Sequence, residues 1–406
     1  MKRSSLRIKK PTITAIVLTL STALLNVLSW RSSAFSDAYI KYAFPYLAGS
    51  YSRVTGIFPF SVGEFLIALG LVLVAAAILF GVIRFCIFII EKIHRAFRGG
   101  NAGNERDYSL IKKIIRRYYR IFLWILLIVA FIMTLNCFIL YHATPYEERF
   151  FADVKDVDER EELSELLILR NGIVTELKNL APELLRDEEG RIAYPGSKRD
   201  MQDEACRMMR EIGATEGISQ LSGFYPRPKA LISSDFMCQQ YMQGYYFPFS
   251  MEANYNDVMY VNNKPFTMCH ELAHLKGFIY EDEANFIGFL ACINSDDIYF
   301  KYSGYMTALN YVNNDLINAM NTAPKLSEEV MDKIGVEPLN DLVRSDNIFV
   351  EQKEWDRING KALIDTETVD KAADKFIDAN LKINGVSDGA LSYNRMVRLM
   401  LLYYRN

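Results

Sequence analysis

The stretch PFTMCHELAHLKGFIYEDEAN at residues 265–285 predicts a helix, a tight turn and a second helix. Gly277 is placed to end the first helix in a left-handed conformation, and the second helix is expected to begin near Glu281. His270 and His274 are four residues apart, so on a helix both imidazoles lie on one face and can reach a single metal ion. The first helix is therefore expected to carry a metal site.

Glu271 stands beside the first histidine and completes an H-E-x-x-H motif. Zinc lowers the pKa of a bound water, and a carboxylate in this position can take the proton while the water attacks a carbonyl group. The chain has only 4 histidines, so a chance occurrence of the motif is rare. We expect one zinc ion per chain, held by His270 and His274, with Glu271 as the general base.

A catalytic zinc needs a third protein ligand and an open position. The motif, followed by Glu281-x-x-Ala284-Asn285, resembles the gluzincin class of zinc metallopeptidases. The resemblance implies that Glu281 is the third ligand and that Asn285 supports the metal site without ligating the ion. It also implies a zincin-like fold for the domain that carries the motif.

The spacing departs from the gluzincin pattern in one respect. The gap from His274 to Glu281 is shorter than usual and is closer to the metzincin pattern H-E-x-x-H-x-x-G-x-x-H, which Gly277 matches. Tyr280 occupies the third-histidine position of that pattern, and tyrosine is a poor zinc ligand. Glu283 is the rival ligand. Two carboxylates two residues apart on a helix face different ways, so only one should reach the metal, and we favour Glu281.

Four further residues are predicted to bind substrate or to stabilise the oxyanion. Tyr280 and Tyr393 are the predicted oxyanion groups. Glu252, Asn254 and the strand-like Val258–Val261 precede the motif, where zinc peptidases have an edge strand that binds extended substrate by backbone pairing. The resemblance suggests the same arrangement here. A polar turn followed by a core strand is the alternative.

The amino-terminal third of the chain is basic and apolar, unlike the remainder. Residues 1–142 hold 18 Lys+Arg and 5 Asp+Glu, a balance of +13, which leaves 28 and 44 in the rest, a balance of -16. Three runs lack charge over about the length that a bilayer requires. We expect three transmembrane helices at about residues 11–30, 62–84 and 121–141, the first being an uncleaved anchor and not a cleaved signal peptide.

Basic residues predict the orientation of these spans. The amino terminus is basic, and the segment Glu91–Arg120 holds nine basic and three acidic residues, so both are expected on the cytoplasmic side. The segment Arg31–Gly63 has three basic residues and many aromatic rings, so it is expected on the outer membrane surface. Tyr108–Arg120 predicts an interfacial helix, or an ordinary positive-inside anchor. Everything after His142 is then outside the cytoplasm.

The remainder of the chain is long enough to bury a core of its own. The predicted fold class is mainly α with a small β element: a membrane domain at residues 1–142 and a mostly helical, zincin-like extracytoplasmic domain at residues 143–406. Apolar spacing predicts helices at 157–185, 197–213, 298–321, 325–335, 366–382 and 391–405, and strands at Ala230–Ile232 and Val258–Val261.

Several motifs resemble a family of uncharacterised bacterial membrane proteins, known only as a domain of unknown function. They are the three amino-terminal spans, FPFSVGE at residues 58–64, PFSMEAN at residues 248–254, the H-E-x-x-H helix and Ser392-Tyr393. The resemblance covers most of the chain. It implies a multi-pass protein of the bacterial cytoplasmic membrane, and it implies no established reaction.

Three functions compete. The first is a membrane-anchored zinc metallopeptidase that hydrolyses peptide or amide bonds outside the cytoplasm, in a peptide, a protein or a cell-wall peptide. The second is an intramembrane metalloprotease, which is excluded because His270 lies more than a hundred residues beyond the last span. The third is a non-catalytic sensor or scaffold with a structural or vestigial metal site, which would not require Glu271. The expected partner is the lipid bilayer. Nucleic acid is excluded because the basic residues flank apolar runs.

Overall fold

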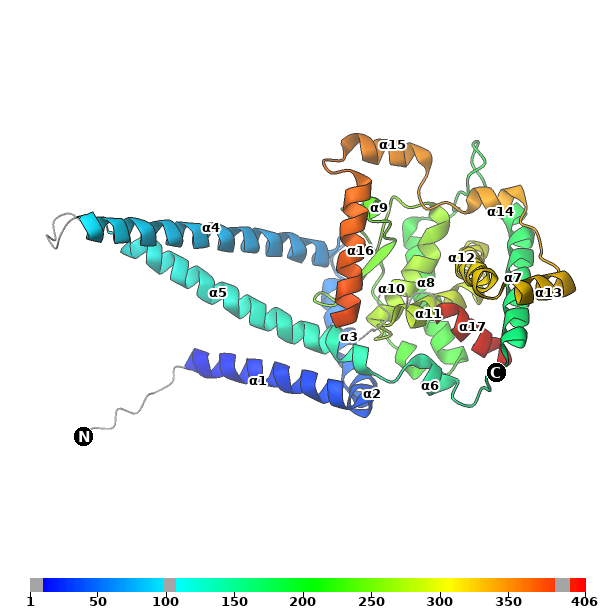
Figure 1. Cartoon of the computed structure of the whole chain (residues 1–406), viewed down its shortest axis with the longest axis horizontal. Helices are drawn as coiled ribbons and strands as arrows, with labels where there is room; N and C mark the ends of the chain where they lie inside the picture. Colours follow the sequence, from blue (N-terminus) through cyan, green and yellow to red (C-terminus); the bar gives the residue numbers. More distant parts are fainter. Residues whose placement is uncertain (1–9, 98–106, 384–394) are drawn as a thin grey trace.

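The computed structural model describes residues 10–97, 107–383 and 395–406. These residues form a mainly helical body from which three long helices extend to one side (Figure 1). A small three-stranded sheet lies within the body. The predicted fold class, mainly α with a small β element and three apolar amino-terminal helices, is confirmed.

The three long helices have the length and composition needed to cross a membrane. The candidate spans are the helical segments Lys10–Arg31 in α1, Val62–His94 in α4 and Ser109–Phe138, which joins α5 to a short π-helical turn. The second and third helices extend beyond the apolar runs expected at about residues 62–84 and 121–141, into sequence that carries charged side chains. The segment expected as a separate interfacial helix forms the first turns of α5 and continues directly into its apolar part. The helices are α1 (Lys10–Arg31), α4 (Val62–Phe97) and α5 (Ser109–Met133).

The segment between α1 and α4 forms two helices that pack on the body. These are α2 (Ser33–Tyr42) and α3 (Phe44–Thr55), and Phe44 is buried in the main core together with Leu140 and Tyr141. Part of the aromatic segment expected on the membrane surface is therefore interior. The hydrophobic core also crosses the domain boundary placed at residue 142.

The helices of the body begin where the sequence offers caps. Asp158 accepts a hydrogen bond from the backbone N–H of Glu161 at the start of α7, and Ser197 and Asp200 form a capping box at the start of α8. The body helices are α6 (Tyr146–Phe150), α7 (Glu159–Leu180), α8 (Lys198–Thr215), α9 (Ser234–Gln239), α10 (Lys264–Leu275), α11 (Glu281–Ile293), α12 (Ile298–Thr322), α13 (Pro324–Ile334), α14 (Asp341–Asp346), α15 (Gln352–Lys361), α16 (Thr366–Ile383) and α17 (Met396–Arg405).

The sheet has the order β1-β3-β2, formed by β1 (Lys229–Ala230), β2 (Gly244–Phe247) and β3 (Glu252–Tyr255). β1 is parallel to β3 and β2 is antiparallel to it. The segment expected as the edge strand is therefore central, and β2 lies at an edge. The strand predicted at Val258–Val261 is wrong, because these residues lead into a 3₁₀ turn at Val261–Asn263.

Candidate functional site

The helix α10 places the two motif histidines on one face. A proline stands in its first turn, and Thr267 Oγ1 donates a hydrogen bond to the carbonyl of Asn263 (2.8 Å). Gly277 follows the helix with a φ of 92°, and its N–H donates to the carbonyl of His274 (2.9 Å). The predicted left-handed turn at Gly277 is confirmed, and it returns the chain toward α10.

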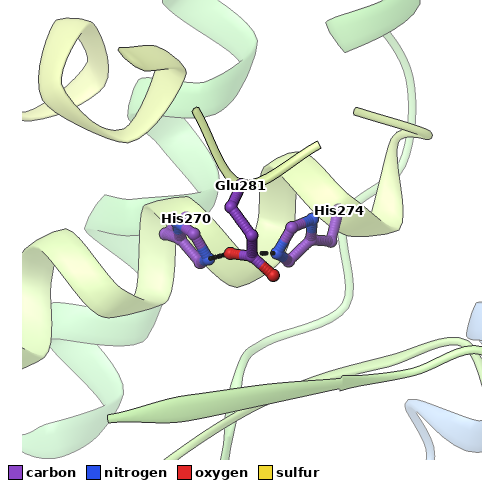
Figure 2. Close-up of side chains that lie close together, drawn as sticks. All are labelled: His270, His274 and Glu281. Atoms are coloured by element: carbon purple, nitrogen blue, oxygen red, sulfur yellow. Dashed lines mark ion pairs between the residues drawn. The ribbon is translucent and has the colours of Figure 1, made fainter. Parts of the chain in front are cut away.

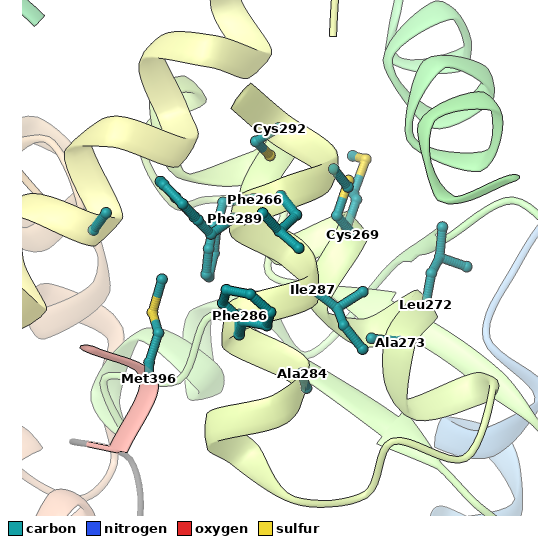
Figure 3. Packing of buried hydrophobic residues seen from close by; sticks show 14 of the residues in the cluster. Phe266, Cys269, Leu272, Ala273, Ala284, Phe286, Ile287, Phe289, Cys292 and Met396 are labelled. Carbon is teal, nitrogen blue, oxygen red and sulfur yellow. The ribbon is translucent and has the colours of Figure 1, made fainter. Parts of the chain in front are cut away.

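The helix α10 packs against α11 in the core (Figure 3). Gly288 of α11 lies so close to α10 that a Cβ there would be 3.3 Å from the backbone nitrogen of His270. Cys269 is fully buried in the same core as Cys292, so its thiol is a packing group. This packing fixes the start of α11 beside the two histidines.

The carboxylate of Glu281, the first residue of α11, lies between the two imidazoles (Figure 2). Its Oε2 is 3.2 Å from His270 Nε2 and 3.5 Å from His274 Nε2. One ligand atom from each of the three residues lies within 4.8 Å of the others. The structure therefore brings His270, His274 and Glu281 together in an arrangement that could hold a metal ion.

Hydrogen bonding and charge orient the cluster. His274 Nδ1 lies 2.8 Å from the carbonyl oxygen of Phe278, which turns Nε2 toward Glu281. Burial alone would raise the pKa of the Glu281 carboxyl, but His274 and His270 hold that pKa well below its usual range. Burial lowers the pKa of His270, and the neighbouring His274 lowers it further. The carboxylate of Glu281 is thus held in its ionised form between the two imidazoles.

Glu271 is buried beside the cluster without being one of its three members. Its Oε2 has no hydrogen-bond partner within the described part of the chain. Gly244 of β2 covers the other oxygen, since a Cβ at this position would lie 2.4 Å from Glu271 Oε1 and 2.8 Å from the carbonyl oxygen of Asn254. Burial raises the pKa of Glu271 to about 8. A buried carboxyl with a free oxygen is suited to accept or donate a proton.

Glu283 points away from the cluster. Its Oε1 accepts a hydrogen bond from the backbone N–H of Tyr146 (2.5 Å), and its Oε2 lies 3.6 Å from a guanidinium nitrogen of Arg149. Asn285 lies beside His270 and donates a hydrogen bond to the hydroxyl of Tyr311 (3.1 Å). Of the two rival carboxylates, only Glu281 stands with the histidines.

The predicted substrate-binding residues have other partners. Tyr280 donates its hydroxyl hydrogen to the carbonyl of Tyr141 (2.5 Å). Asn254 donates from Nδ2 to the carbonyl oxygens of Tyr245 and Glu252, both at 3.1 Å. Glu252 forms a buried ion pair with a lysine of β1 and does not reach the cluster. Tyr393 lies outside the described residues.

Two tyrosines near the cluster were not predicted. Burial raises the pKa of Tyr245, and the charges of Glu271 and Glu281 raise that pKa further, so its hydroxyl lies in the field of both carboxylates. Tyr311, the partner of Asn285, likewise has a pKa raised to about 12, by burial and by Glu281. Both come from elements distant in sequence, β2 and α12, and nothing in their spacing separates them from the other tyrosines of the chain.

The cluster is mostly enclosed. The side chains of His270 and Glu281 are 12% and 17% exposed. A separate groove of about 430 Å³ lies near α15 and α16, and it is lined by Tyr241, Trp355 and polar residues that are not part of the cluster. A ligand would therefore reach the cluster at the exposed edges of His270 and Glu281.

Comparison with known proteins places the chain in a family without assigning a reaction. A family model described as "Protein of unknown function (DUF3810)" matches residues 39–401. The match extends from α2 to α17 and so includes both the juxtamembrane helices and the histidine cluster. No curated protein and no solved structure matches the chain.

Proposed function

The chain belongs to this family of unknown function, and from the geometry of its site we propose that it is a membrane-anchored zinc metallopeptidase. It would hydrolyse peptide or amide bonds outside the cytoplasm. The observation that carries the proposal is the convergence of His270, His274 and Glu281 beside a buried glutamate with a free oxygen. These residue types in this arrangement are the donors and the general base of a catalytic zinc site.

The distances fit zinc. Zinc–nitrogen and zinc–oxygen bonds of about 2.0–2.2 Å place tetrahedral ligands about 3.3–3.5 Å apart. The separations of 3.2 Å and 3.5 Å between Glu281 and the two histidines agree with this. Two neutral imidazoles and one carboxylate would leave a fourth position for water. The unpaired Glu271 Oε2 supports the same conclusion, because a buried carboxyl oxygen without a partner is costly unless a ligand uses it.

Each residue has a role in this proposal. His270, His274 and Glu281 would hold the ion, which when bound would supply an activated water and polarise the substrate carbonyl. Glu271 would accept the proton of that water and later return it to the leaving amine. Tyr245, from the strand that covers Glu271, would donate a hydrogen bond to the oxyanion.

The orientation in the membrane rests on the charges. The basic amino terminus and the basic segment Glu91–Arg120, which includes the end of α4 and the start of α5, favour the cytoplasmic side. Three crossings then put the body, and the site with it, outside the cytoplasm of a bacterial cell.

A non-catalytic sensor or scaffold is the second proposal, and the enclosure of the cluster favours it. A structural metal site is closed, and the side chains of His270 and Glu281 are only 12% and 17% exposed. In that case the metal would contribute to folding and Glu271 would be dispensable.

Glu271→Gln tests both proposals, because it keeps the shape of the side chain and removes its basic oxygen. In the purified full-length protein, zinc content and thermal stability should stay near wild type while activity falls about 10²–10⁴-fold. The same loss of function should appear in cells that show a deletion phenotype. His270→Ala should remove metal and function together. A Glu271→Gln strain with wild-type behaviour would refute the peptidase and favour the scaffold.

A further inference from the structure

The position of the site relative to α4 points to its substrate. We infer that the substrate is a polypeptide held in the same membrane, and that the bond it presents lies within about ten residues of the bilayer surface. The inference rests on the proposed peptidase function. It is carried by the contacts that fix the sheet beside Glu271 to the start of a candidate membrane span.

The first contact is a buried carboxylate at the start of α4. Glu252 of β3 accepts hydrogen bonds from the backbone N–H groups of Val62 (3.1 Å) and Gly63 (2.7 Å), the first two residues of the helix. Lys229 of β1 pairs with Glu252 and donates to the carbonyl of Phe60 (2.9 Å). The pair is 1% and 6% exposed, so water does not compete for these bonds.

A second set of contacts comes from the next turn. The carboxylate of Glu64 accepts hydrogen bonds from the backbone N–H groups of Ile232 and Ser233, both at 2.9 Å, just before α9. Gly63 is in close contact with the ring of Phe247, since a Cβ on this glycine would be 2.1 Å from Phe247 Cδ2. The end of β2 is therefore in direct contact with the first turn of α4.

The histidine-bearing side of the body is fixed in the same way. The hydroxyl of Tyr280, at the start of α11, donates to the carbonyl of Tyr141, which follows α5. Gly277, after α10, packs against Phe44 of α3, where a Cβ would be 3.0 Å from the ring. The helices that carry the cluster thus rest on the segments that enter and leave the membrane spans.

The length of β2 sets the distance. Phe247 contacts the start of α4, and Gly244, at the other end of the strand, contacts Glu271. Three residues of strand span about 10 Å at about 3.4 Å per residue. Glu271 therefore lies at most about 10 Å along the strand from the first turn of the span. An extended substrate covers that distance with about three to five residues.

Aromatic rings lie between the start of α4 and the site. The rings of Tyr245, Phe247 and Phe249 stack in a row, with centroids 5.2 Å and 5.5 Å apart, and the two outer rings are partly exposed while Phe247 is buried between them. Beside the start of α4, Ile57 and Phe58 are 78% and 43% exposed. Exposed aromatic side chains such as Phe58 settle at the level of lipid headgroups. An apolar segment leaving the bilayer would meet exposed apolar side chains at the start of α4, whereas a water-soluble protein would have to reach into this interfacial layer.

Cells that carry wild-type protein or Glu271→Gln at equal levels provide the test. New protein amino termini are mapped in both strains, and the termini that depend on Glu271 are measured against the nearest membrane span or lipid anchor. We expect them within about ten residues of the anchor. Dependent termini in soluble proteins, or far from any anchor, would overturn the inference and leave the peptidase standing. If no terminus depended on Glu271, the peptidase itself would fail.

A second experiment tests distance directly. A substrate found in this way is incorporated with the full-length protein into lipid vesicles, and flexible spacers of about 5, 10 and 20 residues are inserted between its span and the cleaved bond. The rate should fall at least about tenfold with the longest spacer, because a longer tether lowers the local concentration of the bond near the membrane. An equal rate at every spacer length would contradict the inference.

Discussion

The buried pair Lys229–Glu252 should be one of the strongest polar contacts in the body, and Glu252→Gln tests this. The substitution keeps the shape of the side chain but leaves the Lys229 ammonium without a counter-charge in a site that is 6% exposed, where its other acceptors are the carbonyl oxygens of Thr55 (2.7 Å) and Phe60 (2.9 Å). Removing one member of a buried pair costs about 3–5 kcal/mol. Because two carbonyl acceptors remain, we expect about 3 kcal/mol.

The measurement is thermal unfolding of the full-length protein in detergent micelles, followed by intrinsic tryptophan fluorescence. For a body of this size, about 3 kcal/mol corresponds to a fall in Tm of about 6–12 °C. Lys198→Met is the matched control. Its pair with Asp257 leaves the Lys198 side chain 66% exposed, so its loss should cost less than about 1 kcal/mol.

The double variant Lys229→Met/Glu252→Gln decides whether the two side chains act as a pair. Neither charge is then buried alone, so the loss of stability should be smaller than the sum of the single losses by about 2 kcal/mol. Additive losses would refute the reasoning. Metal content should be unchanged in Glu252→Gln, in Lys229→Met and in the double variant, because neither residue belongs to the histidine cluster.

Three further outcomes follow from the site and the spans. Glu281→Gln should lower zinc content at least about tenfold, the usual effect of losing a metal-site contact. Glu283→Gln should keep the metal and lower Tm, because Glu283 binds the backbone of Tyr146 in α6. Metal loss only in Glu283→Gln would reverse the assignment of the third ligand. Gly244→Ala should lower activity at least about tenfold without removing metal, because the added Cβ would displace the Glu271 side chain. Gly49→Ala is the control, because a Cβ there would have no atom within 4 Å. Equal activity of the two variants would contradict a role for the contact between Gly244 and Glu271. A reporter at the carboxy terminus should be extracytoplasmic and one between α4 and α5 cytoplasmic, and the opposite readouts would overturn the orientation.

The sequence was sufficient to find the histidines because helical geometry alone places His270 and His274 on one face. It could not decide between Glu281 and Glu283 by spacing, since the choice depends on where α11 begins and how it packs. Two residues turn a helix by about 200°, so when Glu281 faces α10 its neighbour faces the opposite way. In the structure that opposite direction is toward Tyr146, a contact between residues far apart in sequence.

The sheet was less accessible to prediction. β3 has only four residues, and its central place depends on pairing with β1 and β2, which no local pattern records. Glu252 was assigned to substrate binding because it precedes the motif, yet the backbone N–H groups that it binds lie in FPFSVGE at residues 58–64. That segment and PFSMEAN at residues 248–254, two of those that resemble the family, are therefore in contact through Glu252. Tyr245 was missed for a similar reason, because its position depends on the pairing of β2 with β3, where it stands opposite Asn254.

The attachment of α4 also concerns the thickness of the membrane. The uncharged run of α4 lies between Glu64 and Arg84, at residues 65–83, and its 19 residues at 1.5 Å per residue span about 29 Å, close to the about 30 Å of the hydrocarbon layer. A bilayer of different thickness makes such a helix change its tilt, or deforms the lipid around it. Because the first turn of α4 is fixed to the sheet, the helix cannot change its tilt independently of the body. A thicker bilayer, in which α4 stands more upright, would therefore rotate the whole body relative to the lipid surface.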